Sequence, residues 1–311
     1  MVKHVISWKD WDSKAISEMV DLAISMKKNP EKYNEELKDK SLIMLFEKTS
    51  TRTRLSFEIG MTKLGGHAVF LEWSKSNIGI TEAALEAAVM SRYADFIMAR
   101  LKLNSTLEGL AKGSTVPIIN ALTEKYHPCQ GLADYMTVKE FGKDFSKCRM
   151  IYVGMYNNVA NSLVSAGTKL GCEVYVVCPE KNPPAIDKEL LDQAKATGLF
   201  HETLDIKEAL DTDKTCFLYT DTWVDLEHFK DPAYAEEKER RMNTMMPYQI
   251  NKDMASKGNK EPYVMHCMPI HVGYEMGDDI LPDKYDKNII YDQAENRMWT
   301  EMALLSYLAK H

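Results

Sequence analysis

Two hydrophobic patterns alternate along the chain. Short, nearly continuous apolar runs, typical of strands buried on both faces, are separated by longer segments in which apolar residues recur every three or four positions, as in helices. In the first half, the short runs predict strands at 41–46, 67–71, 95–99 and 116–120. The longer segments predict helices between Asp12 or Ser13 and Pro30, and at 52–64, 82–93 and 107–111.

The second half repeats this alternation. Its apolar runs predict strands at 149–153, 173–178, 215–219, 263–265 and 288–291. Helical spacing is found at 159–170 and 295–309, and the charged run 236–241 is typical of a solvated helix face. Strands that alternate with helices at this spacing predict parallel sheets with helices on both faces.

The predicted fold class is therefore α/β, with two doubly wound domains, each built on a central parallel sheet. A helical pattern that begins after HPCQ (127–130) and is broken at Gly142 predicts a bridge between the halves. We expect one domain at 1–142, a second at 143–294, and a terminal helix 295–311 that packs back on the first. Helices would join the domains, and we expect the active site in the cleft between them.

Composition narrows the classes of function. The chain has 311 residues, 45% of them hydrophobic and 27% charged, and a formal net charge of -7. An acidic chain is a poor match for a nucleic acid, and no uncharged apolar run approaches the roughly 18 residues that a membrane span needs. We therefore expect neither a nucleic-acid partner nor a membrane partner.

The N-terminal segment and the cysteines indicate the compartment. Residues 1–14 combine charges with two tryptophans and have no apolar core, which is unlike a signal peptide. The six cysteines form no CxxC pair and show no histidine spacing typical of zinc. We expect reduced thiols, a cytoplasmic protein, no metal and no organic cofactor.

The first turn of the second half argues against a nucleotide site. Residues 154–161 read GMYNNVAN, with asparagines where a dinucleotide fingerprint needs glycines. The chain also has no GxxxxGK[ST] motif. Nucleotide binding is therefore disfavoured.

The junction between the first strand and the next helix is rich in groups that bind anions. It reads FEKTSTRTRLSFE over 46–58, with hydroxyls and guanidiniums crowded at the helix start. The backbone N–H groups at a helix start have no partner in the helix, and the helix dipole favours a negative charge there. A phosphate could dock on this end, with the hydroxyls and guanidiniums completing its coordination. Taken alone, the same residues fit a capped helix with exposed arginines equally well.

Polar clusters follow other predicted strands in the same way. Arg100 ends strand 95–99, HPCQ follows strand 116–120, HCMP (266–269) follows strand 263–265, and ENR (295–297) follows strand 288–291. The carboxyl ends of the strands in a parallel sheet border one crevice, so we expect these groups to converge.

These motifs, in this order, resemble the aspartate/ornithine carbamoyltransferase family, and within it the ornithine branch. The resemblance also includes LGGH, MAR, YHPCQ, NNVANS, TDTW and QAENR, at 64–67, 98–100, 126–130, 157–162, 220–223 and 293–297. It covers nearly the whole chain. It implies transfer of the carbamoyl group from carbamoyl phosphate to the side-chain amine of L-ornithine, giving L-citrulline and phosphate. It also implies a homotrimer with shared active sites and a place in arginine metabolism.

The resemblance assigns a role to each matching residue. The carbamoyl phosphate set is Ser50, Thr51, Arg52, Thr53, Arg100, His127, Gln130, Cys267, Met268 and Arg297. The ornithine set is Asn158, Asp221, Asp225 and Leu226. The catalytic set implied is Arg100, His127, Cys267 and Asp221. Within these sets, Arg100, His127 and Thr53 polarise the carbamoyl oxygen and Gln130 holds the carbamoyl nitrogen.

Two segments depart from the family pattern. After TDTW the family has Ser-Met-Gly one residue on, whereas this chain has Asp225, Leu226 and a longer segment. A carboxylate there would attract an amine and repel the ornithine carboxylate, which keeps putrescine, another diamine or a modified ornithine as alternative acceptors. The segment 76–88, which in relatives approaches the next subunit's site, also differs. A catalytically silent, ligand-binding relative is the alternative from another class.

Overall fold

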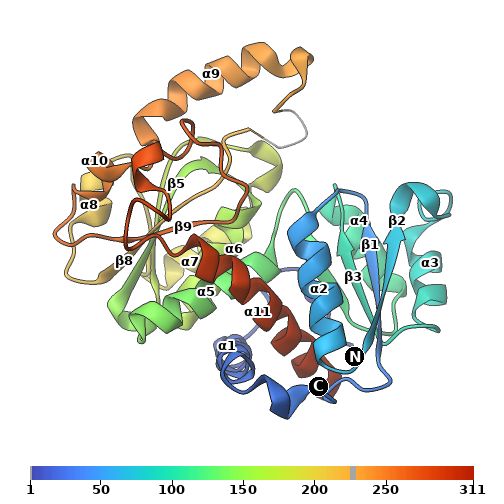
Figure 1. Ribbon diagram of the computed structural model, residues 1–311. Coiled ribbons are helices and arrows are strands. Elements are labelled where there is room, and N and C mark those ends of the chain that lie inside the picture. The colour runs from blue at the N-terminus through green and yellow to red at the C-terminus, as the bar shows by residue number, and fades with distance from the viewer. Residues whose placement is uncertain (1, 225–228) are drawn as a thin grey trace. The chain divides into compact units, whose positions relative to one another are not determined.

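The chain folds into two compact units joined by two helices. The computed structural model describes residues 2–224 and 229–311. One unit comprises Met1–Met136 and Glu295–His311, and the other comprises Thr137–Ala294. The helices α5 (Pro128–Gly142) and α11 (Ile290–Lys310) each begin in one unit and end in the other (Figure 1).

The first unit is built on a four-stranded parallel sheet in the order β2-β1-β3-β4. Its strands are β1 (Ser41–Phe46), β2 (His67–Glu72), β3 (Phe96–Arg100) and β4 (Ile118–Leu122). The helices α3 (Ala83–Met90) and α4 (Asn104–Gly113) share one apolar cluster with Leu45, Ile97 and Ala99 of the sheet. The predicted alternation of strands and helices therefore corresponds to a layered α/β structure, in which helices pack against the sheet.

Two further helices of this unit pack together because one residue is small. Helix α2 (Thr51–Lys63) lies against α11 at Gly60, where an added Cβ would come within 3.1 Å of the Met302 side chain. Figure 1 shows these two helices side by side. Helix α1 (Ser13–Lys28) begins where predicted, because Asp12 Oδ1 accepts a hydrogen bond from the Ala15 N–H at 2.8 Å.

The second unit is built on a five-stranded parallel sheet in the order β7-β6-β5-β8-β9. Its strands are β5 (Cys148–Tyr156), β6 (Glu173–Lys181), β7 (Phe200–Glu202), β8 (Thr215–Thr220) and β9 (Tyr263–His266). Its own helices are α6 (Asn158–Leu170), α7 (Lys188–Ala196), α8 (Ile206–Leu210), α9 (Ala235–Met245) and α10 (Lys252–Ala255). Every residue of β5 is buried, as its position in the middle of the sheet requires. The predicted fold class, two α/β domains on parallel sheets, is confirmed.

One predicted element is wrong. The segment 288–291 is not a strand, because α11 already begins at Ile290 and Asn288 makes only an isolated bridge to Val264. The Asn288 side chain accepts a hydrogen bond from the Ile290 N–H at 3.1 Å, and the Ile289 carbonyl accepts one from Gln293 at 2.9 Å. Ile289 and Ile290 are buried, so an apolar run that reads as a strand is the buried first turn of a longer helix.

The other predicted elements are present, whereas helix α7 and the short elements α8, α10 and β7 were not predicted. The charged run 236–241 lies in α9, as predicted. Strand β7 has only three residues, which is below the length at which alternation is legible. Within the described residues, none of the helices combines the length and the apolar character that crossing a bilayer requires.

Candidate active site

The predicted site residues fall in two sets, one in each unit, and the first set starts at the β1–α2 junction. Ser50 caps α2: its backbone is extended, and its Oγ accepts a hydrogen bond from the Thr53 N–H at 3.2 Å. The first turn of α2 contains no acidic residue. It begins at Thr51 and includes Arg52, so hydroxyls, backbone N–H groups and a guanidinium occupy one helix end.

Arg297 connects three helices around this end. Its Nη1 donates to Gln130 Oε1 at 2.8 Å, and its Nη2 donates to Thr53 Oγ1 at 3.3 Å. All three side chains are buried, although Arg297 is on α11, Gln130 on α5 and Thr53 on α2. Residues that are far apart in the sequence therefore meet as the motifs predicted.

His127 lies among positive charges. It is buried, and it immediately precedes α5. Burial, and then the charges of Arg297, Arg100 and Arg52, hold the pKa of His127 well below its ordinary value. The imidazole is therefore neutral near pH 7, and a neutral imidazole with an N–H can polarise a carbonyl oxygen without adding a charge.

Arg100 stands at the carboxyl end of β3, as predicted. Its carbonyl oxygen accepts a hydrogen bond from the Glu47 N–H at 2.9 Å, which ties the end of β3 to the loop that leads into α2. The positive charge of Arg100 helps to lower the pKa of His127, so the guanidinium of Arg100 lies near the imidazole. The first unit thus brings the 50–53 segment, Arg100, His127, Gln130 and Arg297 into one region.

Two buried carboxylates of this region were missed in the sequence. Asp134 accepts a hydrogen bond from Gln130 Nε2 at 2.8 Å, and Glu301 accepts two from Arg297. Each carboxylate is four residues after its partner on the same helix, a spacing that places the two side chains on one helix face. This spacing was the only signal in the sequence, and it is common on exposed helix faces as well.

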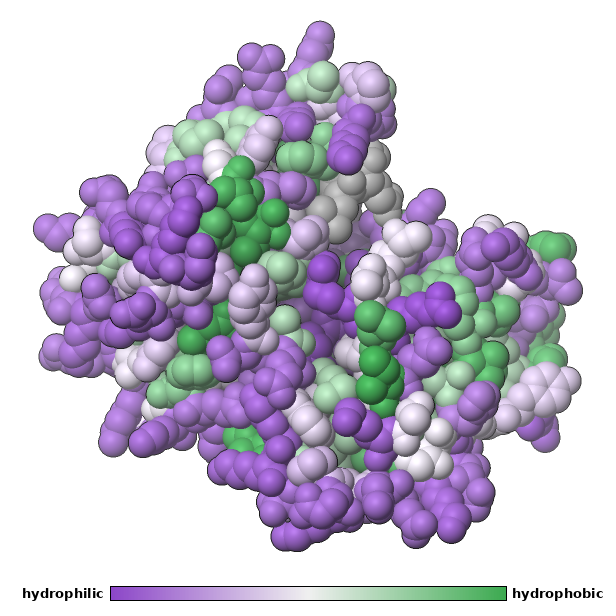
Figure 2. Space-filling view, in the orientation of Figure 1, coloured by the Kyte–Doolittle hydropathy of each residue, from purple (hydrophilic) through white to green (hydrophobic). Residues whose placement is uncertain are grey.

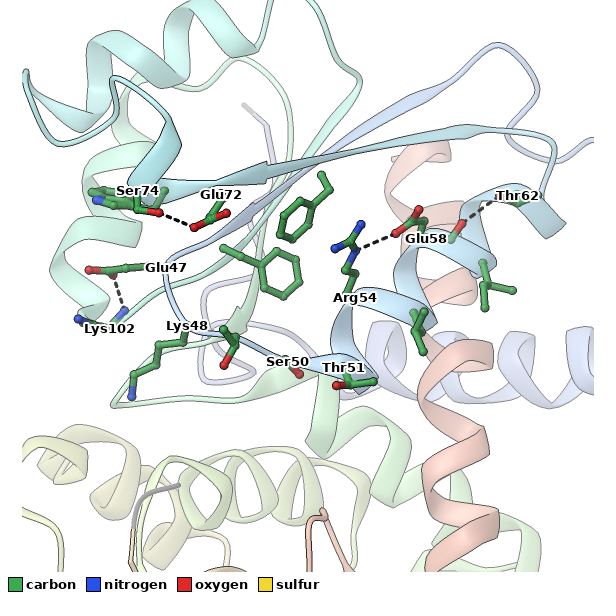
Figure 3. A pocket seen from close by; sticks show the side chains of 16 residues that line it. Glu47, Lys48, Ser50, Thr51, Arg54, Glu58, Thr62, Glu72, Ser74 and Lys102 are labelled. Atoms are coloured by element: carbon green, nitrogen blue, oxygen red, sulfur yellow. Dashed lines mark hydrogen bonds and ion pairs between the residues drawn. The ribbon is translucent and has the colours of Figure 1, made fainter. Parts of the chain in front are cut away.

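A cavity of about 1010 Å³ adjoins the start of α2. Among the predicted site residues, Ser50 and Thr51 line it. The other lining residues come from the end of β1 and the loop after it, from α2, from β2 and the turn after it, and from Lys102 after β3. Figure 3 shows Arg54 and Glu58 paired on α2 beside it, with Nε and Oε2 3.2 Å apart. The Arg54 guanidinium also lies 3.9 Å from the centre of the Phe70 ring. Two residues that line the cavity, Glu58 and Phe70, therefore fix the position of the Arg54 side chain.

The second set of site residues centres on Asp221, which follows β8. Its Oδ1 accepts hydrogen bonds from the Thr222 N–H at 2.7 Å and from Cys267 Sγ at 2.9 Å. Its Oδ2 accepts one from Asn157 Nδ2 at 2.6 Å. Because Asn157 follows β5 and Cys267 follows β9, the ends of three strands meet at this carboxylate.

Asn157 is a further residue that the sequence reasoning did not single out. Its Oδ1 caps α6 by accepting from the Val159 and Ala160 N–H groups at 2.9 and 3.2 Å, so its Nδ2 is turned toward Asp221. Asn158, the predicted ligand, is the first residue of α6. Asn157, one of the asparagines that made a dinucleotide site unlikely in the sequence, thus caps a helix and orients a carboxylate.

His266 stabilises the turn that contains Cys267 and Met268. The Met268 N–H donates to His266 Nδ1 at 2.7 Å, so the ring proton lies on Nε2, which is 3.3 Å from Glu275 Oε1. Met268 has φ of 62°, a left-handed conformation that side chains other than glycine rarely adopt, and the Met268–Pro269 peptide is cis.

Glu275 is ionised in this network. Burial alone would raise its pKa, but hydrogen bonds from His266 and His271 outweigh burial and lower the pKa to about 2. The buried carboxylate therefore stays charged and holds the histidine that braces the turn. Two other predicted residues, Asp225 and Leu226, lie outside the residues that the structure describes.

The two sets of residues suit an enzyme that binds a phosphorylated donor and transfers a group from it. Comparison with known families agrees. The model of the carbamoyl-P binding domain of aspartate/ornithine carbamoyltransferases matches residues 3–140, and the model of the Asp/Orn binding domain matches residues 146–308. The chain belongs to the aspartate/ornithine carbamoyltransferase family.

Individual relatives cover the chain almost completely. The ornithine carbamoyltransferase of Moritella profunda is 39% identical over an alignment of 315 positions that covers 99% of this chain and 100% of that protein. The structure of the Pyrococcus furiosus ornithine carbamoyltransferase has a TM-score of 0.87 and 37% identity, and the match covers 97% of this chain and 96% of that one. The anabolic ornithine carbamoyltransferase of Campylobacter jejuni also gives a TM-score of 0.87, with 34% identity and 99% of each chain covered.

Proposed function

We propose that the protein transfers the carbamoyl group of carbamoyl phosphate to the side-chain amine of L-ornithine, forming L-citrulline and phosphate. The observation that carries this proposal is the buried cluster in which Arg297 reaches Gln130 and Thr53 beside a neutral His127. The full-length relatives named as ornithine carbamoyltransferases support ornithine as the acceptor. No metal or organic cofactor takes part in the proposed reaction.

The first domain, 1–142 with the terminal helix 295–311, binds carbamoyl phosphate in this proposal. Ser50, Thr51, Arg52 and Thr53 hold the phosphate group at the start of α2. Arg100, His127 and Thr53 donate hydrogen bonds to the carbamoyl oxygen, Gln130 accepts one from the carbamoyl nitrogen, and Arg297 adds a further guanidinium. The capped helix start, without any acidic residue in its first turn, supports the phosphate end.

The second domain, 143–294, binds the acceptor in this proposal. Asn158 and Asp221 bind the α-amino acid end of ornithine, with Asp225 and Leu226 alongside. Cys267 faces the attacking amine, and the backbone of Met268 faces the carbamoyl group. The hydrogen bond from Cys267 to Asp221 supports placing both residues at one substrate.

The reaction follows from these positions. The neutral amine attacks the carbamoyl carbon, and the carbonyl π electrons move onto oxygen, where donors stabilise the developing charge. The C–O bond to phosphate then breaks, and the amine proton passes to phosphate, Asp221 or Cys267. Holding the two small substrates in the reacting geometry accounts for a second large part of the rate enhancement.

An amine panel tests the acceptor. With carbamoyl phosphate in excess, we expect phosphate release with L-ornithine to exceed that with putrescine or N-acetylornithine by at least about 10²-fold in kcat/KM. Asp225→Ser, assayed in parallel, should change this preference if the carboxylate selects the amine. A preference for a diamine would overturn ornithine but keep carbamoyl transfer. No turnover with any amine would indicate a silent relative.

We further propose a cytoplasmic homotrimer, acting in arginine metabolism, whose active sites are shared between subunits. Apolar side chains on α2 and in the segment 80–93 support a protein partner: Leu55, Ile59, Ile80, Leu85 and Tyr93 are 45–81% exposed. Figure 2 shows strongly hydrophobic residues on the surface in the region of α2. The cavity beside α2 also joins apolar lining to Ser50 and Thr51, as a site completed by a neighbouring chain would.

A mixing experiment tests shared sites. We expect light scattering to give three times the mass of one chain. Arg100→Ala should be nearly inactive alone. So should the double variant Ser76→Ala/Asn77→Ala, because these two residues belong to the segment 76–88 that we propose completes the neighbouring subunit's site. Subunits co-refolded from both variants should regain part of the wild-type activity, because some hybrid interfaces then carry no substitution. A monomeric mass, or no regained activity in a trimeric mixture, would contradict the proposal.

A further inference from the structure

Glu301 is a buried carboxyl group for which the proposed mechanism has no role. Burial raises its pKa above the ordinary value, and the charge of Arg297 and hydrogen bonds from Ser56 and Arg297 oppose this rise. Glu301 is on α11, one turn after Arg297, and only 1% of its surface is exposed. Its Oε1 accepts hydrogen bonds from Arg297 Nη2 at 2.6 Å and from Arg297 Nε at 3.1 Å. Burying a carboxylate costs free energy unless it is paired with a positive charge. Here the partner is Arg297, whose guanidinium bonds to Glu301 along one edge and also to Gln130 and Thr53, two predicted substrate ligands.

We propose that Glu301 is a positioning residue for carbamoyl phosphate, which it affects by aiming Arg297 at Gln130 and Thr53. This inference rests on the proposed function of the first domain. A guanidinium is planar and has five N–H donors in a fixed arrangement. When Glu301 holds the Nε edge, Nη1 and the second Nη2 hydrogen point away from it, and these are the atoms that donate to Gln130 and Thr53.

The effect of Glu301 extends to the orientation of the Gln130 amide. Arg297 can only donate and the Asp134 carboxylate accepts, so the amide between them has its oxygen toward Arg297 and its nitrogen toward Asp134. The Gln130 oxygen has two lone pairs, and Arg297 uses one. The other is available for an N–H of the carbamoyl group. Through Gln130, Glu301 therefore acts on the carbamoyl end of the donor. The phosphate end depends on the start of α2, which Arg297 contacts through the longer hydrogen bond to Thr53.

Electrostatics supports the same role. Burial alone would lower the pKa of Arg297, but the charges of Glu301, Cys129 and Asp134 and the hydrogen bonds to Glu301 together outweigh burial and raise the pKa above its ordinary value. The guanidinium therefore stays charged in a region that already contains Arg52 and Arg100 near His127. Without Glu301, the buried Nε–H would lose its acceptor and the guanidinium would be free to turn toward another one.

Two substitutions separate the hydrogen bonds from the charge. Glu301→Leu removes the acceptor, and Glu301→Gln keeps an acceptor oxygen of the same shape without the charge. Glu295→Gln is the matched control. Although Glu295 belongs to the ENR motif, its side chain is half-exposed on the same helix, where it pairs with Lys27 and Trp299 Nε1 and not with Arg297. Thermal melting checks that each variant is folded.

The readout compares two ligands. Titration calorimetry without any amine measures binding of carbamoyl phosphate and of inorganic phosphate. We expect Glu301→Leu to weaken carbamoyl phosphate binding about 10–100-fold, Glu301→Gln to weaken it about 3–10-fold, and both to leave phosphate binding within about threefold. Glu295→Gln should change neither affinity. In turnover assays, KM for carbamoyl phosphate should rise in the same order.

Specific results would overturn this role. Unchanged carbamoyl phosphate binding in folded Glu301→Leu would do so, as would an equal loss for both ligands or an equal effect of the two substitutions. If Glu301→Leu does not fold, Glu301→Gln decides, and carbamoyl phosphate binding equal to wild type contradicts the proposal. Wild-type protein that binds carbamoyl phosphate but carbamoylates no amine would instead sink the proposed function and leave the role of Glu301 standing.

Discussion

Replacing Arg100 with alanine is expected to lower kcat about 10²–10³-fold without unfolding the protein. The reason is that Arg100 ends β3 with its charge near the buried His127, where the proposed carbamoyl oxygen becomes negative during attack. A donor aimed at that oxygen contributes most in the transition state, so its loss appears in kcat more than in KM. Steady-state kinetics with both substrates varied measures this split.

The control for Arg100→Ala removes a charge elsewhere in the same unit. Lys112 is exposed in the last turn of α4, and Lys112→Ala should leave kcat within about twofold. A folded Arg100→Ala variant whose kcat falls less than about tenfold would exclude Arg100 from the oxyanion site. A variant whose KM for ornithine rises while kcat holds would place Arg100 at the acceptor.

The pH dependence separates the oxyanion donors from the amine. A free alkylammonium has a pKa of about 10.4, so only about 0.04% is neutral at pH 7, and this fraction rises about tenfold per pH unit. We expect kcat/KM for ornithine to rise from pH 6 to 9, with a similar slope in Arg100→Ala, because the slope belongs to the amine. The pKa of His127 lies well below its ordinary value, so His127 adds no inflection at or above neutral pH. A flat profile with chemistry rate-limiting would contradict this mechanism.

Much of the fold could be predicted because buried parallel strands have a simple sequence pattern. Strands β1 and β3 are nearly continuous apolar runs, since helices cover both faces of the sheet, and the position of Asp12 marks the start of α1. The same rule failed at 288–291, where two isoleucines are buried in the first turn of a helix. A short apolar run indicates that the residues are buried but not whether they form a strand or a helix. Here the helix is favoured by the Asn288 side chain, which accepts a hydrogen bond from the Ile290 N–H, and a single side chain is a weak signal in a sequence.

The candidate site was predictable to the extent that topology fixes it. Parallel strands place Arg100 at a strand end and His127 and Cys267 after strand ends, so their grouping within each unit follows from the order of elements. Asp134 and Glu301 were missed for a physical reason. A carboxylate one turn after a polar residue looks the same in sequence whether it faces solvent or is buried against a guanidinium.

The second large effect is expected at Asp221. Asp221→Asn should lower kcat/KM for ornithine about 10²–10³-fold while leaving KM for carbamoyl phosphate within about threefold. Both carboxylate oxygens accept hydrogen bonds, from Asn157 on one side and from Thr222 and Cys267 on the other. An asparagine must present its NH₂ group to one of these donors, which loses a hydrogen bond and places two donors face to face.

The substitution also removes the negative charge that the proposed α-ammonium group of ornithine would meet, and a lost partner of a partly buried charge typically costs about 2–5 kcal/mol. Asp205→Asn is the matched control: Asp205 is in the same unit and accepts a hydrogen bond from the Lys207 N–H at 2.8 Å, but it caps α8. Kinetics with each substrate varied, and melting curves for both variants, distinguish binding from folding. Equal losses for the two substrates, or a loss that Asp205→Asn shares, would show that Asp221 supports the fold of the second unit and does not select the acceptor.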